Sequence, residues 1–571
     1  MTSRAFRALT RHFVVAIVEP PILNDLGVDG LRKVLLSIVA GFLMLGFFVS
    51  RLFHRRYVDF EALPTPAAYL RALPGDTLFV LALPMLIIGL MAVVLSPMLF
   101  PDETDYSVLT PLPLTRAQLF GAKLAALAIV AGVGVAAINS TWSLAFPMFT
   151  GGRWATHGLL ARVLAHAVAS LAASVWMVTA VMALQGACLL TLPARWRPRF
   201  TMALQAATLL ALLVSIPFLV RSIGRTLSSA TVATAPQMYL PPIWFLGLEQ
   251  WLLDGARAGG YARAAAAAGI ATLTTLAIVA GAFVRLFRSA ETLAGTVDRR
   301  RQRASWRVRL QTLLQRAWLP GPTTAVVGFA TRGLLRNRLQ QFVFLLVMGW
   351  GFALLSAQIA TIAEGRTSVD LRPREAINAA VAAPLLVALC ATLGLRAAFL
   401  LPLDRGAGWV FRITDDPSTR PAALDGVTWA LGLGAIVPAL LVGVVLQPPL
   451  LGGSTVSCLA LTVLAVLTLI EIVLAPWRRV PYACSYLPGK RHITYTLAVV
   501  LGAYALFVAI GSNLLRWSSV HPARTLFTGG LLLALFAAMR RARLRAWGGL
   551  PLQFEDEDPD RTIVIALGPV S

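Results

Sequence analysis

Long apolar runs separated by short polar segments recur along the whole chain. Most of the runs contain about 18 or more residues, which is enough for a helix to cross a hydrocarbon core of roughly 30 Å. A membrane-spanning β-barrel would instead show alternating segments of about ten residues. The pattern therefore predicts an all-α polytopic membrane protein with about twelve transmembrane helices. The predicted spans are Val34–Phe53, Leu78–Leu99, Leu119–Phe146, Val163–Leu192, Met202–Val220, Ala264–Phe287, Phe342–Ile362, Ala376–Leu401, Val427–Leu446, Val456–Ala475, Ile493–Leu515 and Leu526–Met539.

A basic, polar stretch after the sixth run divides the chain into two sets of spans. The predicted division is a first six-helix half at 1–287, a basic cytoplasmic linker with a connector helix at 288–338, a second six-helix half at 339–540 and a cytoplasmic tail at 541–571. The first half opens with an amphipathic segment, Ser3–Val18, in which Arg4, Arg7 and Arg11 share one helical face. Such a helix either lies in the membrane interface or packs its apolar face on protein.

The polar stretch Asp102–Lys123 between the second and third spans predicts a tight turn. Pro111 and Pro113 exclude a helix interior there, because proline lacks the backbone donor and clashes with the preceding turn. Thr115 and Gln118 follow at the spacing of a capping box, in which each side chain bonds the backbone amide of the other residue. The next helix should therefore begin directly after this turn.

The second half repeats parts of this pattern at the same places. Thr110, Pro113, Thr115 and Arg116 align without a gap to Thr414, Pro417, Thr419 and Arg420. Basic segments at 193–199 and 476–492 also occupy matching positions between the fourth and fifth spans of each half. These matches predict two parallel six-helix repeats.

Composition supports the membrane assignment and limits the partners. The chain has 571 residues, 57% of them hydrophobic and 13% charged, with a formal net charge of +24. Because the arginines gather in particular loops and are not interleaved with aromatic residues, the positive-inside rule explains them better than nucleic-acid binding. This rule places both termini in the cytoplasm and the chain in the inner (plasma) membrane, although it leaves Arg51, Arg55 and Arg56 outside.

The turn and the helix start after it resemble the cytoplasmic coupling segment of ABC exporter permeases of the second type. Pro113, Thr115, Arg116, Leu119 and Lys123 occupy the positions of that family's motif. The resemblance implies a membrane subunit, driven by a separate ABC-type ATPase that docks on this segment and holds the ATP and magnesium. It also implies a connector helix before the first span and six spans in each half.

The resemblance also implies which residues contact the ATPase. They are Pro111, Pro113, Thr115, Arg116, Gln118, Lys123, Pro417, Thr419 and Arg420. The second half departs from the motif, because Val427 stands at the lysine position and Asp415, Asp416 and Asp425 are added. Unequal engagement of the two halves is one consequence. A fused chain would also supply both halves without self-association.

Residues for catalysis within this chain are sparse. No GxxxxGK[ST] motif occurs, so ATP hydrolysis is expected on a partner chain and no cofactor or metal is expected in this one. His166 is expected to be a hydrogen-bonded core residue, and the four cysteines are expected to be small core residues. Glu471 lies near a span end, where it could reach the membrane surface or pair with Arg478.

Three alternatives to an exporter permease stay open. A membrane-embedded transferase would use Asp102, Glu103 and Asp105 to hold a divalent metal. A secondary transporter would need charged residues deep in its spans, and the predicted spans are nearly free of charge. The third alternative is a permease-like scaffold that does not transport. Neither the substrate nor the direction of transport follows from the sequence.

Overall fold

The computed structural model describes residues 3–18, 27–96, 115–193, 196–223, 237–294, 321–367, 373–403, 416, 418–475, 477–483 and 493–548. These residues form helices joined by turns, with no β-strand among them. The chain divides into two compact units, Met1–Arg300 and Arg301–Ser571. The all-α class predicted from the apolar runs is therefore confirmed.

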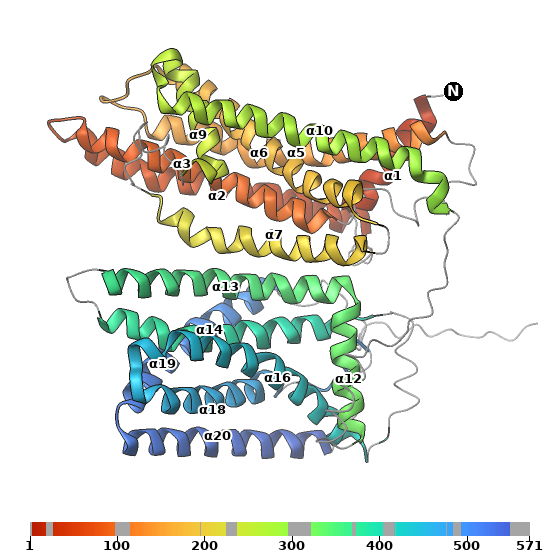
Figure 1. Ribbon diagram of the computed structural model, residues 1–571, viewed down its shortest axis with the longest axis vertical. Helices are drawn as coiled ribbons and strands as arrows, with labels where there is room; N and C mark the ends of the chain where they lie inside the picture. The colour runs from red at the N-terminus through yellow and green to blue at the C-terminus, as the bar shows by residue number, and fades with distance from the viewer. Residues whose placement is uncertain are drawn as a thin grey trace, which may run out of the picture. The chain divides into compact units, whose positions relative to one another are not determined.

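Unit 1 contains eight described α-helices (Figure 1). They are α1 Ser3–Val18, α2 Gly27–Glu61, α3 Ala67–Leu95, α5 Arg116–Phe149, α6 Leu159–Thr191, α7 Arg197–Val220, α9 Pro241–Asp254 and α10 Gly260–Ala294. Three of these helices contain internal prolines, Pro74 and Pro84 in α3, Pro147 in α5 and Pro217 in α7. Neighbouring helices in a membrane bundle can satisfy the backbone groups that such prolines release.

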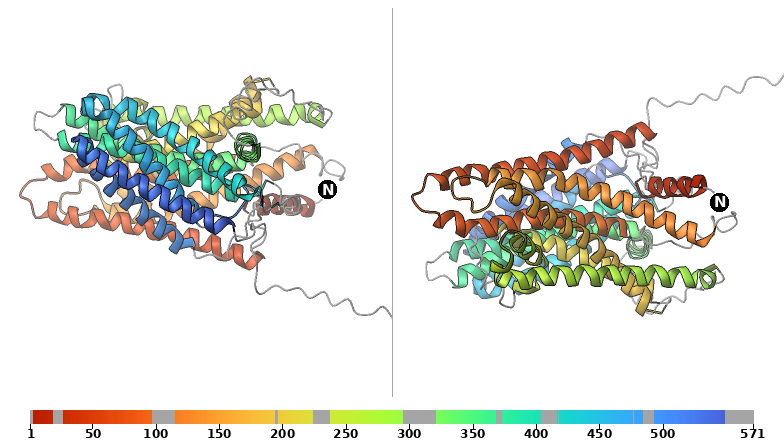
Figure 2. Two further views of the ribbon diagram at one scale, coloured as in Figure 1. Left: turned by 90° about the horizontal axis from the view of Figure 1, so that it is seen from below. Right: turned by 90° about the horizontal axis from the view of Figure 1, so that it is seen from above.

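Unit 2 has a connector helix followed by long helices. The described elements are α12 Gly321–Arg336, α13 Arg338–Thr367, α14 Pro373–Leu400, α16 Arg420–Leu446, α17 Pro448–Leu451, α18 Thr455–Leu474, α19 Ile493–Ser519 and α20 Pro522–Gly548. In Figure 1, α12 runs across the ends of α13, α14 and α16, and the left view of Figure 2 shows α12 end-on and α20 lengthwise.

Ten helices of the described part are long and apolar enough to cross a membrane. They correspond to predicted spans two to ten and twelve, with the fourth predicted span forming the 33-residue helix α6. Predicted spans one and eleven fall in α2 and α19, and part of each helix has side chains that the structure does not describe. The structure therefore establishes a multi-pass helical membrane protein with ten candidate spans.

The core of each unit is built around one largely buried span. In unit 1, 61% of the most apolar part of α3 is buried, and α3 packs against α6, α7 and α9. In unit 2 the corresponding value for α14 is 83%, and α14 contacts α13, α16 and α19. Both helices are rich in alanine and leucine, and small residues such as alanine let neighbouring backbones approach closely in membrane bundles.

The helix α9 lies between predicted spans five and six, where the sequence analysis predicts no helix. Pro241 and Pro242 form its first turn. Proline fits there because the first amides of a helix have no intrahelical partner. Phe245 and Leu246 are fully buried against unit 1, so α9 is part of the core.

Candidate functional site

The helix after the predicted proline-containing turn is α5 in unit 1 and α16 in unit 2. The end of each unit at which that helix begins is called its turn end. In unit 1 the predicted capping box is confirmed: the amide of Gln118 donates to Thr115 Oγ1 at 3.3 Å, and the amide of Thr115 donates to Gln118 Oε1 at 3.0 Å. Such reciprocal capping fixes where α5 starts. Pro111, Pro113 and the side chain of Arg116 lie outside the described residues.

The amphipathic helix α1 packs on the first turns of α5. Its apolar face, Leu9, Phe13 and Ile17, is buried in a cluster with Leu119 and Phe120 of α5. Of the two alternatives that the sequence left open, the structure therefore shows packing on protein. The basic face, with Arg4, Arg7 and Arg11, is exposed.

Lys123 lies in this contact between α1 and α5. Its side chain is only 6% exposed, and its Nζ lies 4.6 Å from the centroid of the Phe13 ring. A cation over an aromatic face is attracted by about 0.5–2 kcal/mol, with the larger values at desolvated sites. Lys123, which the resemblance associates with the ATPase, thus contacts the connector helix and links it to α5.

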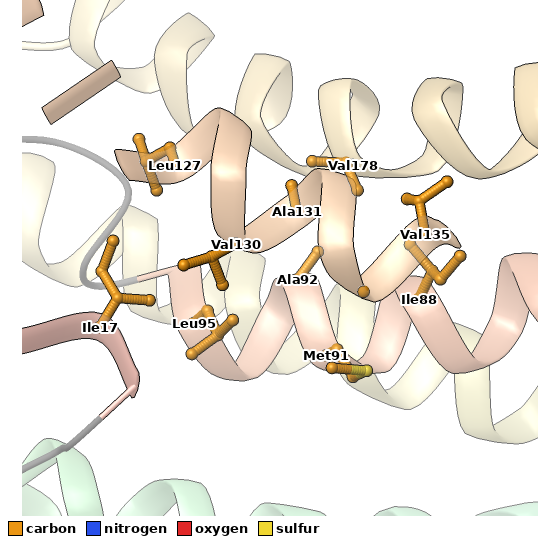
Figure 3. A pocket seen from close by; sticks show the side chains of 11 residues that line it. Ile17, Ile88, Met91, Ala92, Leu95, Leu127, Val130, Ala131, Val135 and Val178 are labelled. Atoms are coloured by element: carbon orange, nitrogen blue, oxygen red, sulfur yellow. The ribbon is translucent and has the colours of Figure 1, made fainter. Parts of the chain in front are cut away.

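An apolar cavity of about 60 Å³ lies beside this junction (Figure 3). It is lined by Ile17 of α1, by Ile88, Met91, Ala92 and Leu95 of α3, by Leu127, Val130, Ala131, Gly134 and Val135 of α5 and by Val178 of α6. No polar side chain lines it. The cavity offers no group for chemistry and indicates imperfect packing between α1, α3 and α5.

The turn end of unit 2 is capped by different groups. Thr419 is the N-cap residue of α16 but makes no side-chain capping bond. Instead, the carboxylate of Asp416 accepts hydrogen bonds from Ser418 N at 3.0 Å and from Ser418 Oγ at 2.6 Å. These bonds hold the pKa of Asp416 below its usual value. Pro417 lies outside the described residues, and Arg420 is the first residue of α16.

The connector helix α12 packs on α16 as α1 packs on α5. Thr323 Oγ1 donates to the carbonyl of Ala422 at 2.9 Å. Gly426 permits the close approach, because a Cβ there would lie 2.7 Å from the Cβ of Val326. In both units, therefore, the helix ahead of the first span contacts the first turns of the helix that follows the proline-containing turn.

Tyr482, in the segment between α18 and α19, also contacts α12, further along the helix than α16 does. Its hydroxyl donates to the carbonyl of Ala330 at 2.8 Å, and its amide donates to the carbonyl of Phe399 at 2.9 Å. Its φ of 64° is the only positive value at a non-glycine residue in the described part, a conformation that costs about 1–3 kcal/mol. The ring fits because residue 333 is glycine; a Cβ there would lie 2.3 Å from it.

A buried ionic network links α16 to α18 and α20 of unit 2. Glu471 of α18 and Arg543 of α20 are 1% and 3% exposed, and they contact through two atom pairs at 2.6 and 2.7 Å. Arg543 also donates to Thr428 Oγ1 of α16 at 2.9 Å. Arg540 pairs with Asp425 of α16 at 3.1 Å. Glu471 therefore pairs with α20, and the suggested partner Arg478 is not the one used.

At the opposite end of unit 1, a buried ion pair lies just outside the first two predicted spans. Asp76 of α3 is fully buried and accepts hydrogen bonds from Arg56 Nη1 at 3.1 and 3.2 Å and from Tyr57 at 3.0 Å. Asp76 belongs to α3 but lies two residues before predicted span two, so the expectation of nearly charge-free spans did not cover it. The pair also explains why Arg56 is tolerated where the positive-inside rule disfavours it.

A second buried pair joins α6 to α9. His166 Nδ1 lies 2.9 Å from Glu249 Oε2, and their exposures are 0% and 7%. The prediction that His166 is a hydrogen-bonded core residue is confirmed. Asn139 of α5 lies in another buried group, in which its amide donates to Ser174 Oγ at 2.9 Å and Ser170 donates to its carbonyl oxygen. Sequence reasoning missed Glu249, because that residue lies between two predicted spans.

Other predicted residues carry little chemistry in the described part of the chain. Cys188, Cys390 and Cys458 are buried free cysteines, as expected. The described residues contain no cluster of three or more His, Cys, Asp or Glu that could hold a metal. Asp102, Glu103 and Asp105 lie outside them.

No protein-family model, curated protein or solved structure gives a significant match to the chain. The function has to be argued from the residues and contacts described above.

Proposed function

We propose that the chain is the membrane-spanning permease subunit of an ATP-driven exporter, with its turn ends in the cytoplasm and ATP hydrolysis on a partner ABC-type ATPase. The observation that carries the proposal is the junction at the turn end of unit 1. There, a helix start capped by Thr115 and Gln118 follows the sequence segment with Pro111 and Pro113, and the helix α1 packs on it.

Mechanical reasoning favours this assignment. A partner's closure can move the spans only if the contacted element is stiff, because a flexible loop would absorb the movement in its own conformational freedom. The capping box, the buried face of α1 and the Lys123–Phe13 contact all stiffen the start of α5. A push on this turn would therefore move α1 and α5 together.

The second unit supports a related role for its own turn. The contact of α12 with α16 repeats the relation of α1 to α5, and it supports two parallel halves of six spans when α2 and α19 are counted. The contacts differ in kind, since unit 2 uses Thr323, Gly426 and Tyr482 where unit 1 uses Lys123 and Phe13. We propose that both turns contact the ATPase, and that unit 2 is held more rigidly.

Site-specific photo-crosslinking tests this proposal. A photoreactive amino acid replaces Arg116 or Arg420 at the two turns, and Arg153 or Arg524 as matched controls at the opposite ends, where both arginines are exposed. Cells that make the chain in its native membrane are irradiated, and crosslinked proteins are identified by mass spectrometry. We expect a P-loop ATPase at positions 116 and 420 and not at 153 or 524.

Absence of any P-loop protein at both turns, in variants that insert normally, would contradict the proposal. A cysteine-labelling result could also contradict it. A membrane-impermeant reagent added to intact cells would then label a cysteine placed at exposed Thr115 and fail to label one placed at Arg153. Once a transport assay exists, replacing Arg116 or placing glycine at Pro111 and Pro113 should abolish transport without loss of membrane insertion.

The buried pairs of unit 1 favour a second candidate, a proton-coupled secondary transporter. Buried acids within membrane helices are typical of ion pathways, and Asp76 and Glu249 are both buried. The two candidates differ in energy source. Proton uptake by proteoliposomes that contain only this chain, lost on Glu249→Gln and kept on Thr115→Ala, would support the second candidate.

A further inference from the structure

Two arginines of unit 1 converge on the end of α6. Arg197, the first residue of α7, donates from Nε to the carbonyl of Leu192 at 2.9 Å. Arg285, near the end of α10, donates from Nη1 to the carbonyl of Leu190. Both guanidinium groups thus lie at the carboxyl end of α6, where the unpaired carbonyls of a helix attract positive charge.

The carbonyls leave most of this positive charge uncompensated. Each guanidinium has five N–H donors, and the described contacts use one from each. Neither arginine forms an ion pair with any described residue, and burial, followed by the nearby charge of Arg285, lowers the pKa of Arg197. The sequences of α6, α7 and α10 contain one acidic residue, Glu291, whose side chain is not described.

The position of the pair matches the boundary of the membrane. The candidate spans Leu159–Thr191, Phe200–Val220 and Gly260–Arg285 all start or end beside it. Trp196 and Phe200 flank Arg197 and are 44% and 51% exposed, as is common for aromatic residues at the level of lipid headgroups. The sequence adds Arg195, Arg199 and Arg288 nearby.

We propose that Arg197 and Arg285 bind the phosphate group of an anionic phospholipid in the adjoining leaflet. Guanidinium groups pair well with phosphate oxygens, and basic pockets between membrane helices bind anionic headgroups. The exposed aromatic side chains beside the pair favour a lipid over free phosphate, because they add apolar contact for the acyl chains. The site lies within unit 1 and does not depend on the proposed permease function.

Native mass spectrometry of the purified full chain in detergent tests the proposal. Phosphatidylglycerol is titrated into the wild type, Arg197→Ala/Arg285→Ala and the control Arg257→Ala/Arg263→Ala, which removes the same charge near the opposite end of α10. An arginine near the surface contributes about fivefold to the affinity for anionic lipid, so the pair should contribute about 30-fold. We expect Arg197→Ala/Arg285→Ala to lose about 30-fold in affinity for phosphatidylglycerol at the tightest site, and the control variant to keep the wild-type affinity.

Further arms separate lipid from other ligands. Arg197→Lys/Arg285→Lys should keep most of the affinity, because it keeps the charge. Arg285 is exposed, and Arg285→Gln alone should lower the affinity for phosphatidylglycerol about fivefold. This single variant tests the proposal if the double alanine variant does not fold. Equal binding of phosphatidylcholine, displacement of phosphatidylglycerol by millimolar inorganic phosphate, or wild-type affinity in Arg285→Gln would each overturn the proposal.

Discussion

The buried pair of Glu471 and Arg543 offers the sharpest test of how unit 2 is held together. Glu471→Gln removes the negative charge that Arg543 contacts directly, while the Arg543 side chain stays 3% exposed beside Thr428. Removing one partner of a buried ion pair costs about 3–5 kcal/mol, because the remaining charge stays desolvated. Since glutamine still accepts one hydrogen bond, we expect a loss of about 3 kcal/mol.

Replacing both partners should restore most of this stability. Glu471→Leu/Arg543→Met leaves no buried charge, and apolar replacements of buried ion pairs are often neutral or stabilising. The double variant should therefore lie within about 1 kcal/mol of the wild type. The control Arg541→Met removes an exposed arginine two residues away and should change stability by less than about 0.5 kcal/mol.

Thermal unfolding in detergent, followed by fluorescence size-exclusion chromatography, measures these differences. For a unit of this size, a change of 1 kcal/mol moves the midpoint by about 2–4 °C, so Glu471→Gln should lower it by about 6–12 °C. The reasoning would be refuted by a double variant as unstable as Glu471→Gln, or by a single variant that unfolds like Arg541→Met. Either result would mean that the pair is not desolvated as described.

Three further predictions concern the turn ends and the cavity. Lys123→Met should remove the cation from the Phe13 ring, lower stability by about 1 kcal/mol and speed hydrogen exchange in α1 while leaving α12 unchanged. Tyr482→Phe should lose the hydrogen bond to Ala330, cost about 1 kcal/mol and speed exchange in α12 but not in α1. Ala131→Val should fill part of the apolar cavity and raise the unfolding midpoint by about 2–4 °C, whereas a decrease would show that the cavity is too tight.

The sequence by itself determined the features that depend on neighbouring residues. Apolar runs of span length predict helices because backbone groups in lipid must be satisfied within one segment. The start of α5 follows from Thr115 and Gln118, which bond each other across three positions. Periodicity also gives the two faces of α1, because side chains three and four positions apart share a helical face.

Only the tertiary structure decided which distant groups meet. Glu471 finds Arg543, 72 positions away, and His166 finds Glu249 across 83. Helix packing brings these side chains together, and no spacing rule within one segment predicts which distant residues will pair. The helix α9 was missed for a related reason: prolines allow either a loop or a helix start, and burial of its apolar face against unit 1 selects the helix.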